Sequence, residues 1–449
     1  MGLSRFKKAA CVILTAAVLA GLLAGCGKQA AEGDVQSNGS KTDDTEEAQK
    51  TITYWTWVPT DSQWKLCYDA FQKKYPNIKV EFWRGEKPDY DKKLQVAMAA
   101  GQGPDVLGMQ VGAMLKQYEK NLEPIKPLAD SKWGSGWESK LSEAATKQTL
   151  ASDGTLVALP INFTAQEFVI YNKTLFDEAG IKDVPKTYDE WLDVNKKLTA
   201  KGIIPVAFGG KDGWHCDDLF IALSNQFGPG KVYEAEAGKL SWTDKTFVDT
   251  MGAIKKLFDN VFQKGALGVA TYPDARDQYF YSRKAAMFPT GTWHVSFTVA
   301  PSGEKFGTKI ENDETGMFIL PKIGPYDPVA IAGVDTAIAI NKDSKNKDAA
   351  WELFSFMAMD EGQQIMAETV QGSPSRKGIT VSLDSVKFQS EKDAINAANK
   401  IVAESKYKRQ LDYPELSDAL GVAVQDVAAG KPIDKALEEL QKVSEKIKR

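Results

Sequence analysis

Histidine is nearly absent from this chain, since only His215 and His294 occur among its 449 residues. No H-E-x-x-H or C-x-x-C segment accompanies them, so the sequence predicts no metal site. No G-x-S-x-G, Walker A or dinucleotide-binding motif is present either, and no cofactor is expected. Of the four cysteines, Cys67 and Cys216 could pair only if the fold brings them together, and we expect both to be free.

The chain also lacks an excess of positive charge. Its 56 Lys and Arg residues face 60 Asp and Glu residues, which gives a formal net charge of −4 at pH 7. A protein that binds nucleic acid usually carries a basic surface that neutralises phosphates. We therefore expect no nucleic-acid partner.

Long hydrophobic runs are scarce. Ala9–Leu23 is uncharged and mostly apolar, but it is too short for a comfortable membrane span. Basic residues precede it and small residues follow it, so residues 1–25 are predicted to be a secretory signal peptide. The ending Leu23–Cys26 resembles the bacterial lipobox, which implies that Cys26 is acylated and anchors the protein to the extracytoplasmic face of the cell membrane. The alternative is a plain signal peptide with an accidental cysteine at its end.

Residues 27–50 contain no aromatic side chain and are rich in small and charged residues. Such a segment cannot bury enough apolar surface to fold, so residues 26–50 are predicted to be the lipidated cysteine and a flexible tether. A flexible chain of this length reaches about 25–30 Å. The folded part would begin at Thr51, and its roughly 400 residues suggest two or more domains.

The folded part opens with alternating strands and helices. Strands are predicted at Thr51–Trp57, Ile78–Trp83 and Asp105–Met109 from their β-branched and aromatic residues. A helix capped by Thr60 and a second helix, Tyr90–Ala100, separate them. This β-α-β-α-β order is typical of a parallel α/β sheet.

The stretch Asp153–Asn172 has a different pattern. Thr155–Leu159 is predicted to be a strand that Pro160 ends, because proline has no N–H for the ladder. Asn162–Thr164 then forms a polar and aromatic break before a second strand, Phe168–Tyr171. The stretch is either an ordinary loop within one sheet or a place where the chain crosses between two lobes.

Strands and helices alternate again after this stretch. A helix capped by Thr187 comes first, and later strands are predicted at Ile204–Phe208, Ala285–Phe288, Gly316–Leu320 and Ile331–Ile340. The resumed pattern on both sides of Asp153–Asn172 favours a lobe crossing there.

Seven short motifs occur along the chain in a fixed order. They are AFQKKYPNIKVEF (70–82), AAGQGPDVL (99–107), ALPINF (158–163), VIYNKTLFDEAGI (169–181), PKTYDEW (185–191), GTW (291–293) and GSPSRKG (372–378). None is specific by itself. Their co-linear order, from about Thr51 to the C-terminus, closely resembles that of the family 1 extracellular solute-binding proteins, which are the substrate-binding lipoproteins of carbohydrate ABC importers.

The resemblance implies an α/β protein with the two-lobed, periplasmic-binding-protein-like fold of type II. One lobe would comprise residues 51–159 and 331–376, and the other residues 160–330 and 377–449. A ligand would lie in the cleft between the lobes and be enclosed when the hinge closes. The implied function is high-affinity extracytoplasmic binding of a sugar or oligosaccharide by a monomer, without catalysis, and delivery of that ligand to the permease subunits of an ABC importer.

A sugar offers apolar faces and many hydroxyl groups, so its receptor needs aromatic rings and planar polar side chains. In α/β sheets such groups lie beyond the C-terminal ends of strands. Trp57 follows the first strand and is the best candidate there, whereas Trp55 is assigned to the core. Trp293 matches the family's G-x-W position, which implies stacking on a sugar. Trp214, on a polar loop, and Phe163 are further candidates, and core packing is the alternative for the tryptophans.

Four polar residues are candidates for hydrogen bonds to a ligand. Asn162 lies in the predicted break and matches a cleft-facing position of the family, and Gln110 follows the third strand. Asp335 interrupts the apolar strand IAGVDTAIAI, so its carboxylate either accepts from the ligand, which we favour, or pairs with a buried cation. Arg376 matches the family's Ser-Arg after the last hinge segment, and it either reaches a ligand hydroxyl or pins the hinge.

Two other functions stay open at this point. A binding protein of the same fold could take a polyamine or another small solute, which would need several carboxylates around aromatic rings or basic residues at helix N-termini. A surface glycoside hydrolase would need paired carboxylates about 5–10 Å apart, a requirement that the 60 acidic residues could meet. The mixture of few acids, several amides and aromatic rings among the candidates favours a neutral polyol.

Overall fold

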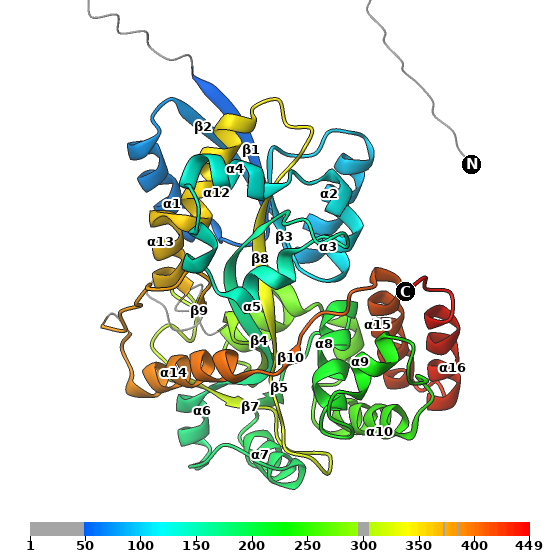
Figure 1. Ribbon diagram of the computed structural model, residues 1–449. Helices are drawn as coiled ribbons and strands as arrows, with labels where there is room; N and C mark the ends of the chain where they lie inside the picture. The colour runs from blue at the N-terminus through cyan, green and yellow to red at the C-terminus, as the bar shows by residue number, and fades with distance from the viewer. Residues whose placement is uncertain (1–48, 295–304, 371–372, 385) are drawn as a thin grey trace, which may run out of the picture. The chain divides into compact units, whose positions relative to one another are not determined.

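The computed structural model describes residues 49–294, 305–370, 373–384 and 386–449 (Figure 1). These described residues form one compact unit. The predicted signal peptide, Cys26 and nearly all of the tether lie outside the described residues, as does Gly372 of the last motif. Within the described part, no helix is long and apolar enough to cross a membrane.

Ten strands form a single mixed sheet in the described part of the chain. Seven follow one another in the order β2-β1-β3-β8-β4-β6-β5, while β7 and β9 pair with β4 and β10 pairs with β8. The strands are β1 (Lys50–Thr56), β2 (Ile78–Arg84), β3 (Val106–Met109), β4 (Leu159–Asn172), β5 (Ile204–Val206), β6 (Ala285–Gly291), β7 (Thr315–Ile319), β8 (Ile331–Ile340), β9 (Ser373–Pro374) and β10 (Tyr407–Lys408).

The helices gather in groups around this sheet. The helices α1, α12 and α13 pack on one another beside β1, whereas α8, α10, α15 and α16 form a second group (Figure 1). A further helical segment covers Thr271–Tyr281. The α-helices are α1 (Asp61–Lys74), α2 (Lys87–Ala99), α3 (Ala113–Tyr118), α4 (Ile125–Trp133), α5 (Glu143–Thr146), α6 (Lys173–Glu178), α7 (Tyr188–Ala200), α8 (Gly213–Ser224), α9 (Lys231–Glu236), α10 (Lys245–Asn260), α12 (Lys347–Met359), α13 (Glu361–Val370), α14 (Gln389–Glu404), α15 (Pro414–Ala428) and α16 (Ile433–Ser444).

The predicted β-α-β-α-β opening is confirmed, because β1 pairs in parallel with both β2 and β3. Thr60 caps α1 as expected. Its side chain accepts a hydrogen bond from the Gln63 backbone, and the Gln63 side chain accepts one from the Thr60 backbone at 2.9 Å. The parallel pairing brings the carboxyl ends of β1 and β3 to the same edge of the sheet, where side chains that follow them can meet.

The stretch around Pro160 differs from the prediction. β4 runs from Leu159 to Asn172 without ending, and it pairs with β8 in an antiparallel ladder. The ladder accommodates the proline and the polar residues after it through register shifts on both sides of Asn162. The predicted strand over residues 155–159 is wrong, since only Leu159 of these residues lies in a strand, and the predicted break is an irregularity inside β4.

Two large hydrophobic clusters make up most of the core. The first takes its residues from segments 52–161 and 334–366, and the second from segments 169–331 and 411–440, so β4 and β8 contribute to both. Cys67 is buried in the first cluster and Cys216 in the second. Both cysteines are free, as expected from the sequence.

Candidate ligand-binding site

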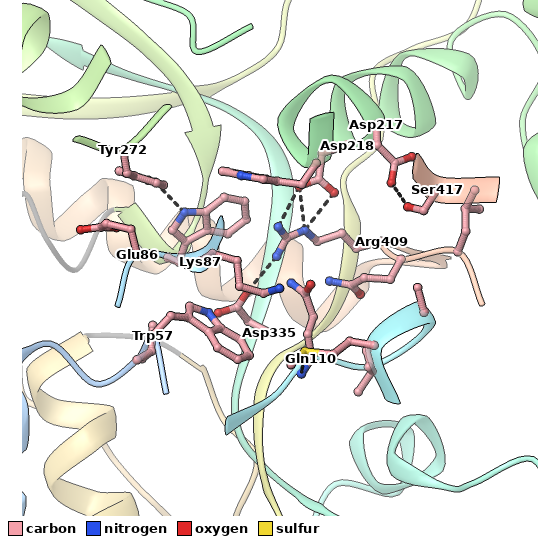
Figure 2. Close-up of a pocket in the computed structure, with 18 of the residues that line it drawn as sticks. Trp57, Glu86, Lys87, Gln110, Asp217, Asp218, Tyr272, Asp335, Arg409 and Ser417 are labelled. Atoms are coloured by element: carbon pink, nitrogen blue, oxygen red, sulfur yellow. Dashed lines mark hydrogen bonds and ion pairs between the residues drawn. The ribbon is translucent and has the colours of Figure 1, made fainter. Parts of the chain in front are cut away.

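A cavity of about 120 Å³ is lined by residues that follow β1, β2 and β3 and by residues from α8, the Thr271–Tyr281 segment and residues 409–417 (Figure 2). Trp57 follows β1 and Gln110 follows β3, so both lie at the carboxyl edge of the parallel strands. Five of the eight predicted ligand contacts line the cavity, namely Trp57, Gln110, Trp214, Trp293 and Asp335.

Trp57 is a fixed part of the cavity wall and only 8% of it is exposed. Its ring packs against the ring of Tyr90, with 5.1 Å between the centroids. Lys87 Nζ lies 5.1 Å from the Trp57 ring centroid and makes an ion pair with Asp91 at 2.7 Å. Arg84 Nε donates to the Trp57 carbonyl at 3.1 Å, which holds the backbone just after β1.

Trp214 lies in the first turn of α8 and not on the polar loop that we expected. Its ring is nearly parallel to that of Tyr272, with 7° between the planes and 6.2 Å between the centroids. It also stacks on His215, and burial lowers the pKa of His215 to about 3, so that imidazole is neutral. The Nε1–H of Trp214 is buried and has no hydrogen-bond partner among the described residues.

Trp293 is held by contacts on its edge and on one face. Its Nε1 donates to the Tyr272 hydroxyl at 2.9 Å. The Cζ atom of Arg409 lies 4.1 Å from the ring centroid, so the guanidinium covers one face of the indole. A Cβ atom on Gly291 would come within 1.8 Å of the Trp293 ring, which explains why the G-T-W motif begins with glycine. The stacking on sugar that the family resemblance implies for Trp293 stays a prediction.

Asp335 is paired with a buried cation, which is the alternative to the ligand-binding role that we favoured from the sequence. Arg409 Nη1 donates to Asp335 Oδ1 at 2.8 Å, and Arg409 Nε and Nη2 donate to the carboxylate of Asp218 (Figure 2). We call these three residues the Arg409 cluster, and none of them is more than 5% exposed. Burial raises the pKa of Asp218, while the charge of Arg409 opposes that shift.

Asp217, the neighbour of Asp218 on α8, has different surroundings. Ser417 donates a hydrogen bond to its Oδ2 atom, whereas Oδ1 is buried and has no hydrogen-bond partner in the described part of the chain. Burial raises the pKa of Asp217 well above its ordinary value. The Nε2 group of Gln410 is likewise buried and unpartnered in the described part. We call Trp214 Nε1, Asp217 Oδ1 and Gln410 Nε2 the open polar atoms of the cavity.

The charged side chains of the cavity are largely engaged with one another. Arg84 lies 3.3 Å from the carboxylate of Glu86, and Arg276 lies 2.6 Å from that of Asp277. Together with Lys87 and Arg409, every basic residue that lines the cavity thus has an acidic partner. No group of three or more acidic, His or Cys residues in the described chain could hold a metal ion. Paired charges, aromatic rings and open polar atoms suit a neutral ligand that is rich in hydroxyl groups.

Asn162, Phe163 and Arg376 do not line this cavity. Since β4 continues through this region, Asn162 Oδ1 accepts a hydrogen bond from the Thr336 backbone at 2.9 Å and bridges the shifted β4–β8 ladder. Phe163 packs against the first hydrophobic cluster. Arg376 Nη1 donates to the Met359 carbonyl at 2.7 Å, at the end of α12.

Several lining residues were missed by the sequence analysis. The pair Asp217 and Asp218 did carry a signal, because two adjacent acids interrupt an apolar helix, and buried acids need partners. The sequence around Arg409 carried no such signal. It reaches the cavity because β10 pairs with the start of β8 and places the following residues beside it. The missed residues that matter most are Glu86, Asp217, Asp218, Tyr272, Arg276, Arg409, Gln410 and Ser417.

Comparisons with known proteins agree on a class of binding proteins. Residues 54–364 match the family model described as bacterial extracellular solute-binding protein. The galactooligosaccharide-binding protein of Bacillus subtilis is 27% identical over 95% of this chain and 93% of its own length. The multiple sugar-binding protein of Streptococcus mutans is 24% identical over 75% of this chain and 77% of its own. A solved chitin oligosaccharide binding protein has a TM-score of 0.73 at 24% identity, covering 88% of this chain and 98% of that one.

Proposed function

Since the chain belongs to the bacterial extracellular solute-binding proteins, we propose that it binds a sugar or oligosaccharide with high affinity outside the cytoplasm. The predicted fold class, a two-lobed α/β periplasmic-binding-protein-like fold of type II, is confirmed by the likeness to solved structures. The division into lobes at residues 51–159 with 331–376 and residues 160–330 with 377–449 is part of the proposal, and the two hydrophobic clusters support it.

The observation that carries the proposal is the make-up of the cavity. Three tryptophans and Tyr272 line it, and aromatic rings can meet the apolar faces of a sugar. Its basic side chains are engaged by carboxylates, whereas the open polar atoms have no protein partner in the described part. Two N–H donors and a carboxyl oxygen, which donates when protonated and accepts when ionised, match hydroxyl groups, which both donate and accept.

The same features weigh against the two alternatives. A polyamine site would need several uncommitted carboxylates, but Asp218 and Asp335 are bound to Arg409 and Glu86 is bound to Arg84. A glycoside hydrolase would need two carboxyl groups free to transfer a proton and to attack or activate water. The same three carboxylates are engaged by arginines, which weighs against that role as well. Binding without catalysis is the function that this arrangement supports.

We further propose that the protein is a monomer on the extracytoplasmic face of the cell membrane and passes its ligand to the permease subunits of an ABC importer. The membership in the family supports this transport role. The lipobox-like ending Leu23–Cys26 and the tether of residues 26–50 support an acyl anchor on Cys26.

A thermal-shift screen with a panel of sugars, on the full chain in mild detergent, tests the binding proposal. A ligand that binds only the folded state stabilises it by RT ln(1 + [L]/Kd), or about 2.7 kcal/mol at a hundredfold excess over Kd. We expect at least one neutral sugar to raise Tm and to be recovered unchanged. A shift caused by a polyamine, with none from any sugar, would overturn the proposal, and turnover of a glycoside would favour the enzyme.

The anchor is tested separately by Cys26→Ala. We expect the parent protein in the membrane fraction and the Cys26→Ala protein in the soluble extracytoplasmic fraction, with unchanged sugar binding. Cys67→Ala is the matched control, because Cys67 is buried in the first cluster and its loss should leave the protein on the membrane. Recovery of the Cys26→Ala protein with the membrane would contradict the anchor.

A further inference from the structure

Two segments that line the cavity touch each other near the start of α3. Residues 110–114 and residues 409–413 both contribute side chains to the lining (Figure 2). The first segment is anchored in the first hydrophobic cluster by Val111 and Met114, whereas Leu411 is buried in the second cluster. The contact between the segments therefore joins parts of the cavity that belong to the two clusters.

A backbone hydrogen bond forms the centre of this contact. The N–H of Ala113 donates to the carbonyl of Leu411 at 3.0 Å. The Leu411 side chain is fully buried in the second cluster, so its carbonyl is fixed relative to that cluster. A backbone N–H needs a partner, and moving the two segments apart would exchange this partner for water. The hydrogen bond is therefore made only when the two sides of the cavity lie close together.

Gly112 allows the segments to approach this closely. Its φ of +73° lies in the left-handed region that favours glycine. A Cβ atom at this position would lie 2.6 Å from the carbonyl oxygen of Leu411 and 2.9 Å from Cβ of Gln410. Both distances are shorter than van der Waals contact, so a side chain here would push residues 409–413 away. Gly112 itself does not line the cavity.

A second interaction joins the same parts of the chain outside the cavity. Lys116 Nζ on α3 lies 4.1 Å from the ring centroid of Tyr413, which is a cation–π interaction. Tyr413 packs against the second cluster, and neither residue lines the cavity. We call the Ala113–Leu411 hydrogen bond, the close packing at Gly112 and the Lys116–Tyr413 interaction the Gly112 contact.

We propose that the Gly112 contact forms when the cavity closes on its sugar, and that Gly112, Lys116 and Tyr413 are positioning residues that set the affinity without touching the sugar. The inference rests on the proposed function and extends it, because it assigns part of the binding free energy to an interaction between two protein segments. A ligand that prefers the closed form gains from whatever stabilises that form. Loss of the contact therefore weakens binding even though the residues that line the cavity are retained.

Gly112→Ala tests the inference, with Gly101→Ala as its matched control. Both glycines have a positive φ, so both substitutions strain the backbone, but a Cβ on Gly101 meets no described atom within 4 Å. The measurement is titration calorimetry of the full chain in mild detergent with maltose, galactobiose, xylobiose and diacetylchitobiose. For a sugar that binds the parent protein, we expect Kd to rise at least about fivefold in Gly112→Ala and to stay unchanged in Gly101→Ala, because only the first substitution overpacks the contact.

The outcomes separate the inference from the function on which it rests. An unchanged Kd in Gly112→Ala, or an equal rise in both variants, would overturn the inference and leave the proposed function standing. If no sugar of the panel bound the parent protein, the proposed function and the inference would both fall.

Lys116→Met tests the contact without changing the backbone, and Lys93→Met is its matched control. Lys93 Nζ lies 4.1 Å from the ring centroid of Trp55 and 3.7 Å from that of Trp83, beside the first cluster and outside the cavity lining. We expect Kd to rise about two- to fivefold in the Lys116→Met protein only. Stopped-flow tryptophan fluorescence should show the change in the dissociation rate, because the contact forms after the sugar has entered. An unchanged dissociation rate, with both variants shown to be folded by circular dichroism, would contradict the inference.

Discussion

Asp217 and Asp218 are adjacent on α8, but their carboxylates have opposite surroundings. Asp218 accepts hydrogen bonds from Arg409, which also binds Asp335. Asp217 accepts one from Ser417 and keeps Oδ1 without a partner in the described chain. The Arg409 cluster, which we call the paired wall of the cavity, is therefore satisfied by the protein's own charges. The residues of the open polar atoms, Trp214, Asp217 and Gln410, which we call the open wall, leave polar atoms for a ligand.

The difference separates two tasks within one cavity. The Arg409 cluster joins α8, β8 and the segment after β10, which lie far apart in the sequence, so it holds the walls in place. A buried polar atom without a partner lowers the stability of the empty protein and rewards the ligand that supplies the partner. The paired wall fixes the shape, and the open wall supplies recognition.

Arg409→Met breaks the paired wall and should have the largest effect. It leaves the buried carboxylates of Asp218 and Asp335 uncompensated, so the free energy of unfolding should fall by about 3–5 kcal/mol in a denaturant titration. The control is Lys245→Met, which breaks an exposed pair with Asp249 and should cost less than about 1 kcal/mol. A similar loss in both proteins would mean that the Arg409 cluster does not hold the walls.

Trp293→Ala tests whether Trp293, which packs on Arg409 of the paired wall, also contacts the ligand. The ring stacks on Arg409, and its loss removes a cation–π contact worth about 0.5–2 kcal/mol of stability. We also expect sugar affinity to fall by at least ~1 kcal/mol, measured by titration calorimetry, because the indole no longer meets the sugar. Unchanged affinity would assign Trp293 to structure alone and sharpen the contrast between the walls.

Asp217→Asn tests the open wall by its effect on how stability depends on pH. Because burial raises the pKa of Asp217, the folded protein holds this proton more tightly than the unfolded chain does. Stability is therefore lost as pH rises above the ordinary aspartate pKa of 3.8 toward the raised value. The Asp217→Asn protein does not lose stability in this way, because its amide does not titrate.

We expect the Tm advantage of the Asp217→Asn protein to grow with pH between about pH 4 and pH 8. Asp249→Asn, at an exposed site on α10, is the control and should show no such trend. An advantage that stays constant or shrinks with pH would contradict the raised pKa. Weaker sugar binding by the same variant would place the carboxylate at the ligand.

Trp214→Phe is the mildest change, because it removes the unpartnered Nε1–H and keeps a stacked ring. Sugar affinity should fall by about 0.5–1.5 kcal/mol, the net value of one hydrogen bond. Trp191→Phe is the matched control, since Trp191 Nε1 is also buried and unpartnered among the described residues but lies in the second cluster, away from the cavity. Calorimetry should show lower affinity only for Trp214→Phe, and an equal loss in both would contradict the assignment.

The features that local pattern decides were predicted from the sequence. The alternation of strands and helices identified the parallel opening, and the strand-end rule then placed Trp57 and Gln110 at the cavity. The rule worked because both residues directly follow strands, β1 and β3, that pair in parallel with each other. The motifs added Trp293, whose position depends on the preceding glycine.

The features that depend on distant pairing were not predicted. Asn162 was assigned to a break because its neighbours are polar, but β8 supplies the backbone N–H that keeps it inside β4. Arg409 lies 191 residues from Asp218 and 74 from Asp335, so no local period reveals the cluster. The sequence indicated that the Asp335 carboxylate accepts either from the ligand or from a buried cation, and only the fold identifies Arg409 as that cation.

The two buried cysteines have a consequence for measuring motion. Each large hydrophobic cluster contains one thiol, Cys67 in the first and Cys216 in the second. Burial raises the pKa of Cys67 to about 12 and raises that of Cys216 as well, so neither forms the reactive thiolate while it is enclosed. Alkylation then has to wait for local opening, and the two rates report how often each cluster opens. A sugar held by residues of both clusters should slow the alkylation of both cysteines together. The protein therefore needs no added label, because its own two thiols report the opening of each cluster separately.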